Sequence, residues 1–168
     1  LYSSLKASDV TPEGVVKDEA YTVQIYTGHK EDTVWYGGDV ALAAELPNIS
    51  FTDGCFQQNG DFYFAKKEGG IDYKLVKTRV FIENSVVEDG KMSFKLKMDS
   101  IKPIFIQDEY NYRNPFVFNS DGRKYLLFSS NQPGGFGNMD LWYCENKNGS
   151  WEKPNNLGSK INSPGDEV

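Results

Sequence analysis

Short runs of alternating apolar and polar residues, separated by turn residues, make up most of this chain, and they are clearest near its C-terminal end. Three such runs occupy residues 115–119, 124–130 and 139–145. The turn signals that follow them are Asp121-Gly122, the loop 132–137 and Asn148-Gly149, and Trp151 opens a fourth run. Asp-Gly and Asn-Gly pairs between such runs are typical of tight hairpins. The pattern therefore predicts a unit of four antiparallel strands.

The same pattern recurs along the chain at intervals near 60 residues. Aromatic residues stand at Tyr2, Phe64 and Phe128, which are 62 and 64 positions apart. Large apolar residues follow three positions after the hairpin residues Asp32, Asp89 and Asn148, at Trp35, Met92 and Trp151, with spacings of 57 and 59. Recurrence at a fixed period is typical of propellers and solenoids, whose units bury their faces only against neighbours. We therefore expect a large side chain in the Trp151 column to pack between sheets.

The run from Ser120 to Val168 resembles a known family, the WD40-like or TolB-like β-propeller repeat of cell-envelope proteins from Bacteroidota. The resemblance is specific over residues 112–168 and weaker over 1–111, where the middle copy has longer third and fourth strands than the family usually has. The positions that carry it are Asp121, Gly122, Pro133, Gly134, Gly135, Gly137, Asp140 and Trp151. In that family the propeller sits between a tetratricopeptide segment and a peptidoglycan-binding OmpA-like domain, often on an outer-membrane lipoprotein. Neither of those segments is present in residues 1–168.

The expected fold is all-β, a partial propeller of four-stranded antiparallel blades. Residues 1–47 are expected to form a partial blade, 48–111 a degenerate blade, and 112–168 the best-matched blade with the lead-in to another. About three blades cannot close a ring, because propellers need at least four. We therefore expect that neither Leu1 nor Val168 is a native end. Only Asp39 to Leu46 has a helical composition, and we interpret it as a turn between blades.

Composition and charge agree with a β-rich protein and argue against nucleic-acid binding. The chain is 14% aromatic and contains 16 Gly and 7 Pro, the balance of many short strands. Its 24 acidic and 18 basic residues leave a formal charge of −6, whereas a nucleic-acid binder would carry a basic face. The lysines at 91, 95 and 97 alternate with apolar residues, which is typical of a solvated edge strand.

Metal and thiol chemistry have few candidate residues. The only histidine, His29, lies in what reads as a polar turn, and one histidine cannot make a zinc site. The two cysteines, Cys55 and Cys144, are interpreted as buried free thiols, with a disulfide bridge as the alternative. Asp166 and Glu167 together with Asp140 are the one candidate calcium set, but no acidic loop of the usual kind accompanies them. The simpler role for Asp140 is to accept hydrogen bonds from the amides of the preceding loop.

No nucleophile motif, phosphate loop or paired-acid motif is present, so we expect no enzyme and no cofactor. The favoured function is a non-enzymatic interaction or scaffold module in a cell-envelope assembly. The alternative is a propeller that binds a glycan or another small ligand, as part of a hydrolase. Candidate binding residues are the loop residues Gln132, Phe136 and Asn138, with Tyr110, Asn111 and Tyr112 before the first strand. The resemblance implies partners among other cell-envelope or outer-membrane proteins, peptidoglycan through a domain outside this chain, and a location at the outer membrane, periplasm or cell surface.

Overall fold

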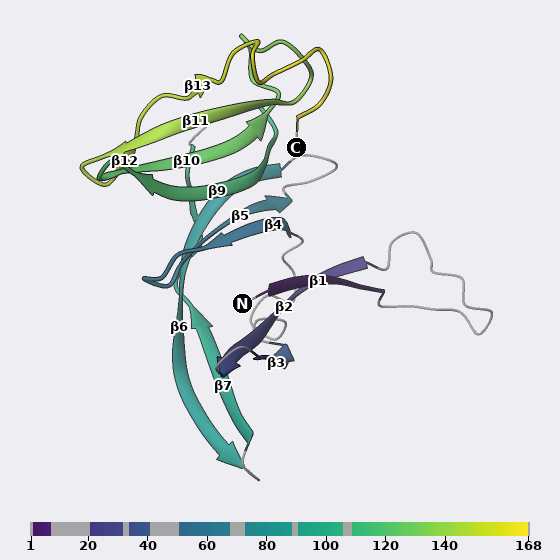
Figure 1. The fold of residues 1–168 in the computed structure, drawn as a ribbon, viewed down its shortest axis with the longest axis vertical. Helices are drawn as coiled ribbons and strands as arrows, with labels where there is room; N and C mark the ends of the chain where they lie inside the picture. The colour runs from purple at the N-terminus through teal and green to yellow at the C-terminus, as the bar shows by residue number, and fades with distance from the viewer. Residues whose placement is uncertain are drawn as a thin grey trace, which may run out of the picture. The chain divides into compact units, whose positions relative to one another are not determined.

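The computed structural model of the chain describes residues 2–7, 21–31, 34–40, 51–67, 73–88, 91–105 and 109–167. Throughout these residues the regular structure consists of antiparallel β-strands, which confirms the all-β prediction (Figure 1). The segment Asp39 to Leu46 is described only at Asp39 and Val40, which belong to a strand. The chain divides into two compact units, residues 1–50 with 80–98, and residues 51–79 with 99–168.

No helix long and apolar enough to cross a lipid bilayer occurs in the part of the chain that the structure describes.

The first unit contains a three-stranded sheet and a long hairpin. The sheet has the order β1-β2-β3, with β1 at Tyr2–Ala7, β2 at Tyr21–Glu31 and β3 at Val34–Val40. The hairpin pairs the second half of β6 (Tyr73–Glu88) with β7 (Lys91–Met98). His29 lies in β2 opposite Tyr36, so the prediction that it occupies a turn is wrong. The reason is that β2 extends for 11 residues, which takes the reversal beyond Glu31.

The second unit contains two sheets that each start as a meander. One is formed by β4 (Phe51–Phe56), β5 (Asp61–Lys67), the first half of β6 and the short β8 (Lys102–Pro103). The other is formed by β9 (Tyr112–Ser120), β10 (Arg123–Ser130), β11 (Asp140–Lys147), β12 (Ser150–Trp151) and β13 (Asn155–Asn156). We call them the middle sheet and the last sheet.

The predicted hairpin turns of the last sheet are present. Asp121 and Gly122 have φ of 50° and 72°, and Asn148 and Gly149 have φ of 53° and 88°. Two successive positive φ angles are the requirement of the type I′ turn, whose twist matches that of the strands it joins. The local sequence alone therefore placed both reversals correctly.

The middle and last sheets have the same strand pairing in detail. Each first strand carries a bulge at a residue with positive φ, Asp53 at 44° and Asn114 at 53°, opposite a buried Phe of the next strand. Asp and Asn are among the few non-glycine residues that adopt this conformation readily. The buried Phe is Phe64 in the middle sheet and Phe128 in the last, the two residues that the repeat pattern had aligned.

Backbone hydrogen bonds beyond the strands repeat as well. Asp99 N–H donates to Arg79 O at 2.9 Å, and Glu152 N–H donates to Glu145 O at the same distance. Five residues further along each copy, Ile104 N–H donates to Leu75 O at 2.9 Å and Leu157 N–H donates to Leu141 O at 3.1 Å. The positions 79 and 145, and likewise 75 and 141, therefore correspond between the two sheets.

Strand register corrects one column of the predicted repeat. Trp151 pairs with Asn146, and the corresponding pair of the middle copy is Val80 with Met98, not with Met92. In the three-stranded sheet Tyr2 pairs with Tyr26 as Phe128 pairs with Trp142, and four residues further on Lys30 pairs with Trp35, which agrees with the alignment of Trp35. The alignment of Met92 is wrong because it was counted from the tip of the hairpin, and the middle hairpin is lengthened at its tip to a 16-residue β6.

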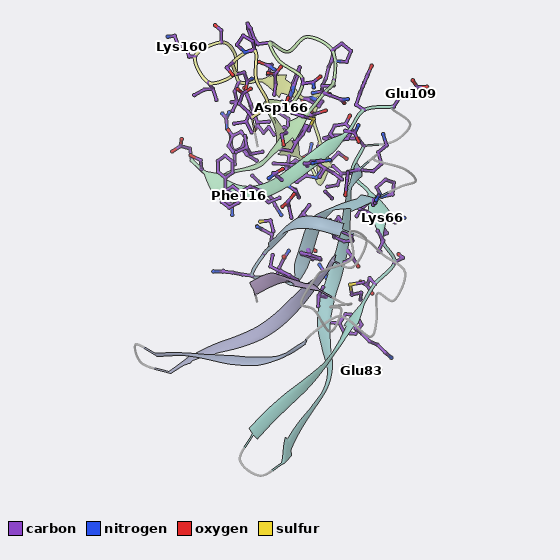
Figure 2. The ribbon with its side chains drawn as sticks, turned by 90° about the vertical axis from the view of Figure 1, so that its right-hand side faces the viewer. Lys66, Glu83, Glu109, Phe116, Lys160 and Asp166 are labelled. Carbon is purple, nitrogen blue, oxygen red and sulfur yellow. The ribbon has the colours of Figure 1, made fainter. Side chains whose placement is uncertain are left out.

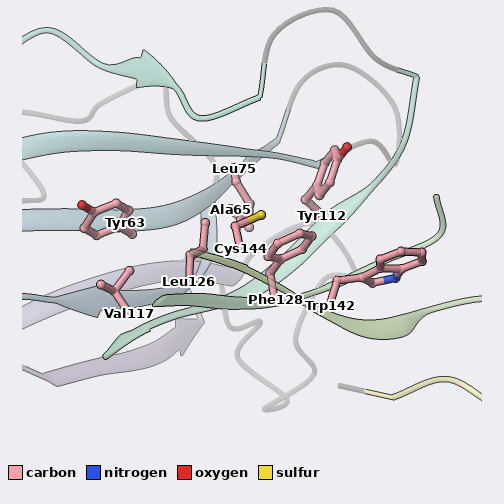
Figure 3. Close-up of a cluster of buried hydrophobic side chains, with 9 residues drawn as sticks. All are labelled: Tyr63, Ala65, Leu75, Tyr112, Val117, Leu126, Phe128, Trp142 and Cys144. Carbon is pink, nitrogen blue, oxygen red and sulfur yellow. The ribbon is translucent and has the colours of Figure 1, made fainter. Parts of the chain in front are cut away.

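The core of the second unit lies between the middle and last sheets (Figure 3). Its nine buried residues are Tyr63, Ala65, Leu75, Tyr112, Val117, Leu126, Phe128, Trp142 and Cys144. Trp151 is half-buried against this cluster, with its ring edge-on to Tyr63 at 6.2 Å between centroids. Trp151 therefore packs between sheets as expected, but its side chain keeps partial contact with solvent.

Candidate recognition loop

The loop 131–139, which joins β10 to β11, is held by the carboxylate of Asp140. Its Oδ2 accepts a hydrogen bond from Phe136 N–H at 2.6 Å, and its Oδ1 accepts one from Gly137 N–H at 3.1 Å. Asn156 Nδ2 donates to the same carboxylate at 3.4 Å. The Asp140 side chain is buried, so these bonds are shielded from water. The role predicted for Asp140 is confirmed.

A second loop, residues 157–167, is tied to the first. Met139 N–H donates to Asp166 Oδ1 at 3.2 Å, and Glu167 N–H donates to Met139 O at 2.7 Å. The buried Asn162 accepts from Leu141 N–H at 2.9 Å and donates to Leu141 O at 3.0 Å. We call the two loops together the loop surface; Asp166 and Lys160 of this surface are labelled in Figure 2. Bonds of this kind make the loop surface a fixed shape and not two independent loops.

The three glycines of loop 131–139 are needed for two different reasons. Gly134 has φ of 97°, a conformation that other residues adopt only under strain. Gly135 and Gly137 do not have positive φ, so they are needed for a different reason. A Cβ at Gly135 would lie 1.5 Å from Asp140 Oδ2, and one at Gly137 would lie 2.0 Å from Gly165 O. Their missing side chains make room for the Asp140 carboxylate and for the second loop.

Large apolar side chains are exposed on both loops of the loop surface. Phe136 is 52% exposed and Ile161 is 56% exposed. Asn138, on loop 131–139, is also exposed. Gln132 is half-buried, and its Nε2 has no hydrogen-bond partner in the described structure. Ile161 was missed by the sequence reasoning, because an apolar residue in a polar loop has no periodic pattern around it.

Three other candidate binding residues do not belong to this surface. Tyr112 is 2% exposed and lies in the core, so the expectation that it is exposed is wrong. Tyr110 is half-buried against the same core, and its carbonyl oxygen accepts a hydrogen bond from Lys74. Asn111 connects segments: it donates from N–H to Asn131 and accepts from Tyr73 N–H, each at 2.8 Å. Local sequence could not reveal that Tyr112 is buried, because an aromatic residue at a strand start faces the core or solvent depending on the bulge that follows.

The acidic residues near the loops are used as hydrogen-bond acceptors. Asp140 and Asp166 each bind backbone N–H groups, and the described residues contain no cluster of three or more His, Cys, Asp or Glu able to hold a metal ion. The candidate calcium set therefore receives no support from the geometry.

Both cysteines are free thiols, as expected, but only Cys144 is buried and Cys55 is half-buried. Cys144 is fully buried, and burial raises the pKa of its thiol to about 12. Cys55 Sγ accepts a hydrogen bond from Val117 N–H of the neighbouring sheet at 3.4 Å. Gln57 Nε2 donates to Val117 O at 2.9 Å, so these two side chains together occupy the free edge of β9. Blocking an edge in this way prevents unwanted strand pairing.

A charged cluster between the sheets was not found from sequence. The nearly buried Asp61 forms ion pairs with Lys77 at 2.7 Å and Arg79 at 3.6 Å. Burial by itself raises the pKa of Asp61, but hydrogen bonds from Lys77 and Asn59 outweigh it, so the pKa lies below its ordinary value. The Nζ atoms of Lys77 and Lys124 lie 5.3 and 5.6 Å from the centre of the Tyr63 ring. These contacts satisfy a buried carboxylate and join the two sheets, which is a structural role.

No known protein-family model, curated protein or solved structure matches this chain.

Proposed function

We propose that this chain is a non-enzymatic interaction module, built from repeated four-stranded sheets of the β-propeller type, that binds another protein of the cell envelope through the loop surface. The observation that carries the proposal is a rigid loop pair with two exposed large apolar side chains, Phe136 and Ile161. Recognition residues are commonly carried on loops that a stable scaffold positions. Aromatic residues in such positions are frequent binding hot spots.

The rigidity of the loop surface favours binding over a purely structural role. Phe136 N–H is fixed by the Asp140 carboxylate, and the second loop is fixed through Met139 and Asp166. A loop backbone held in place loses little conformational freedom on binding, which lowers the entropic cost of association. The resemblance of residues 112–168 to envelope propeller repeats supports a partner in the envelope.

The proposal is tested by capture of partners from envelope extracts of the cells that make the protein. A photo-reactive amino acid at position 136 is expected to crosslink to one specific protein, and the same amino acid at the exposed Lys153 serves as the matched control. The double variant Phe136→Ala with Ile161→Ala is expected to weaken capture by about tenfold, because exposed apolar anchors lose their contact area. Lys160→Ala, on the same loop, is expected to leave capture unchanged.

Unchanged capture by a folded Phe136→Ala, Ile161→Ala variant would contradict the proposal. Binding that survives removal of protein from the extract but not removal of polysaccharide would contradict it as well, and would favour glycan recognition.

A further inference from the structure

The outer face of the last sheet has no partner in the described structure, although its counterpart in the middle sheet is covered. The side chains on this face are Phe116, Phe118, Tyr125, Leu127, Tyr143 and Glu145, which share it by strand register. Phe116, labelled in Figure 2, is 54% exposed. We call this set the open face.

The open face corresponds position by position to the face of the middle sheet that forms the core. Register aligns Phe116 with Cys55, Leu127 with Tyr63, and Tyr143 with Lys77. Tyr63 is buried in the core between the two sheets, and Cys55 packs against the same core. In the middle sheet this face is therefore the one that receives the next sheet.

The opposite faces correspond in the same way. Val117, Leu126 and Phe128 of the last sheet face the middle sheet. Their counterparts by register are Phe56, Phe62 and Phe64, of which Phe62 and Phe64 are fully buried. The two sheets thus pack head to tail, one kind of face against the other, and such packing continues from sheet to sheet until a ring closes or an end is capped.

The chemistry of the open face is suited to an apolar sheet. Phe116 and Phe118 are stacked at 5.9 Å between ring centroids, Phe118 and Tyr125 at 5.5 Å, and Tyr143 lies edge-on to Tyr125 at 6.3 Å. Four aromatic rings in contact form a continuous apolar surface, and surfaces of this kind usually mark an interaction site. Glu145 of this face forms an ion pair with Arg123 at 3.8 Å, so neither requires a charged partner.

We propose that the open face is the docking site for a further sheet of the same repeat, contributed by the same polypeptide and packing as the last sheet packs on the middle one. The sequence Asp166-Glu167 repeats Asp108-Glu109, the pair that precedes β9, and this favours a source in the same chain. The inference rests on the repeat architecture of the proposed function and not on the identity of its partner. Its test therefore uses no envelope protein.

The experiment compares residues 1–168 with a longer chain in which a second copy of residues 111–167 follows Val168. Both chains carry Cys55→Ser and Phe116→Cys, the latter in the first copy only. The buried Cys144 is expected not to react with thiol reagents, because its side chain is out of contact with solvent. The maleimide labelling rate of residue 116 is expected to fall by about tenfold or more in the longer chain. Asn119→Cys, an exposed position on the same strand, is the control and is expected to label equally in both chains.

A matched variant places Val117→Lys and Leu126→Asp in the added copy only, which destroys the face that would dock. Labelling of residue 116 is then expected to return to the rate of the short chain. Equal labelling of residue 116 in the short chain and the folded longer chain would overturn the proposal. So would protection of residue 116 in the short chain that depends on its concentration, since that indicates a second copy as the occupant.

If the short chain is insoluble, yield in the soluble fraction replaces labelling as the measurement. The longer chain is then expected to be at least about tenfold more soluble than the matched variant, because its open face is covered. Equal solubility of the longer chain and the matched variant would also overturn the proposal.

Discussion

The middle and last sheets have the same backbone pairing, but several corresponding positions carry side chains of different chemistry. Asp61 and Arg79 form a charged cross-strand pair in the middle sheet, and the last sheet has Tyr125 opposite Glu145 in that place. Cys55, which packs against a neighbouring sheet, corresponds to the exposed Phe116. The shared features are the turns, the bulge and the alternation of buried residues. These features determine the pairing of strands, whereas the side chains between sheets are free to vary as long as each contact is satisfied.

The largest effect is expected from the matched pair Phe64→Ala and Phe128→Ala. Both side chains are fully buried, and Phe128 contacts the rings of Tyr112 and Phe105 at 5.6 and 5.2 Å between centroids. Each truncation is expected to lower the free energy of unfolding by about 3–5 kcal/mol, the usual range for a buried Phe. Urea denaturation of the two variants measures it. Losses differing by more than about 2 kcal/mol would break the equivalence of the two positions.

Asp140→Ala is expected to have the next largest effect. It removes the acceptor of two backbone N–H groups in a buried place, which costs about 2–3 kcal/mol. Thermal unfolding measures the loss, and limited proteolysis is expected to cut within residues 131–139. Asp166→Ala, whose single bond from Met139 is exposed, is the control with an expected loss below about 1 kcal/mol. A loop that stays resistant to protease in the Asp140→Ala variant would show that the carboxylate does not hold it.

Asp61→Asn tests the comparison of the two sheets through the pH dependence of the free energy of unfolding, because the last sheet has no carboxylate at the position that corresponds to Asp61. The folded-state pKa of Asp61 lies below its unfolded value of 3.8. The contribution of ionised Asp61 to the free energy of unfolding is therefore present above pH 3.8 and is lost as pH falls through the folded-state pKa. The pKa of Lys77 is raised, so its contribution is present below the ordinary value of 10.5 and is lost as pH rises beyond it. At neutral pH both contributions are present, and the variant is expected to lose about 1–2 kcal/mol.

The measurement is the free energy of unfolding across the acidic range. Asp61→Asn is expected to flatten the decline of this free energy below pH 3.8. An identical acid profile for wild type and Asp61→Asn would contradict the ion pair.

The smallest effect is expected from Gly122→Ala and Gly149→Ala in the two type I′ turns. Neither added Cβ would meet another atom within 4 Å, so the cost comes only from the positive φ angles of 72° and 88°. Each variant is expected to lose about 1 kcal/mol. Differential scanning calorimetry measures both, and a loss in one turn alone would mean that the two hairpins are not equivalent.

The sequence by itself determined the conformation of residues that have strong local preferences. Asp121-Gly122 and Asn148-Gly149 specify tight turns by their backbone conformations, and the alternation around Phe128 specifies strands with one face inward. Asp140 could be assigned to the loop amides because its partners lie only three and four residues away. These interactions are local, so composition and spacing are sufficient to infer them.

Only the tertiary structure decided which faces meet and which residues correspond between copies. Met98, and not Met92, corresponds to Trp151, because strand pairing has to be counted from the base of the hairpin. The number of residues between the base and the tip cannot be read from the sequence, since β6 is lengthened at the tip. Tyr112 faces inward because the bulge at Asn114 shifts the alternation of β9, and an aromatic residue gives no sign of this in advance. Lys124 lowers the pKa of Asp61 and lies over the ring of Tyr63 only when the two sheets are packed together. Contacts between residues far apart in the chain depend on register and packing, and a single sequence leaves both open.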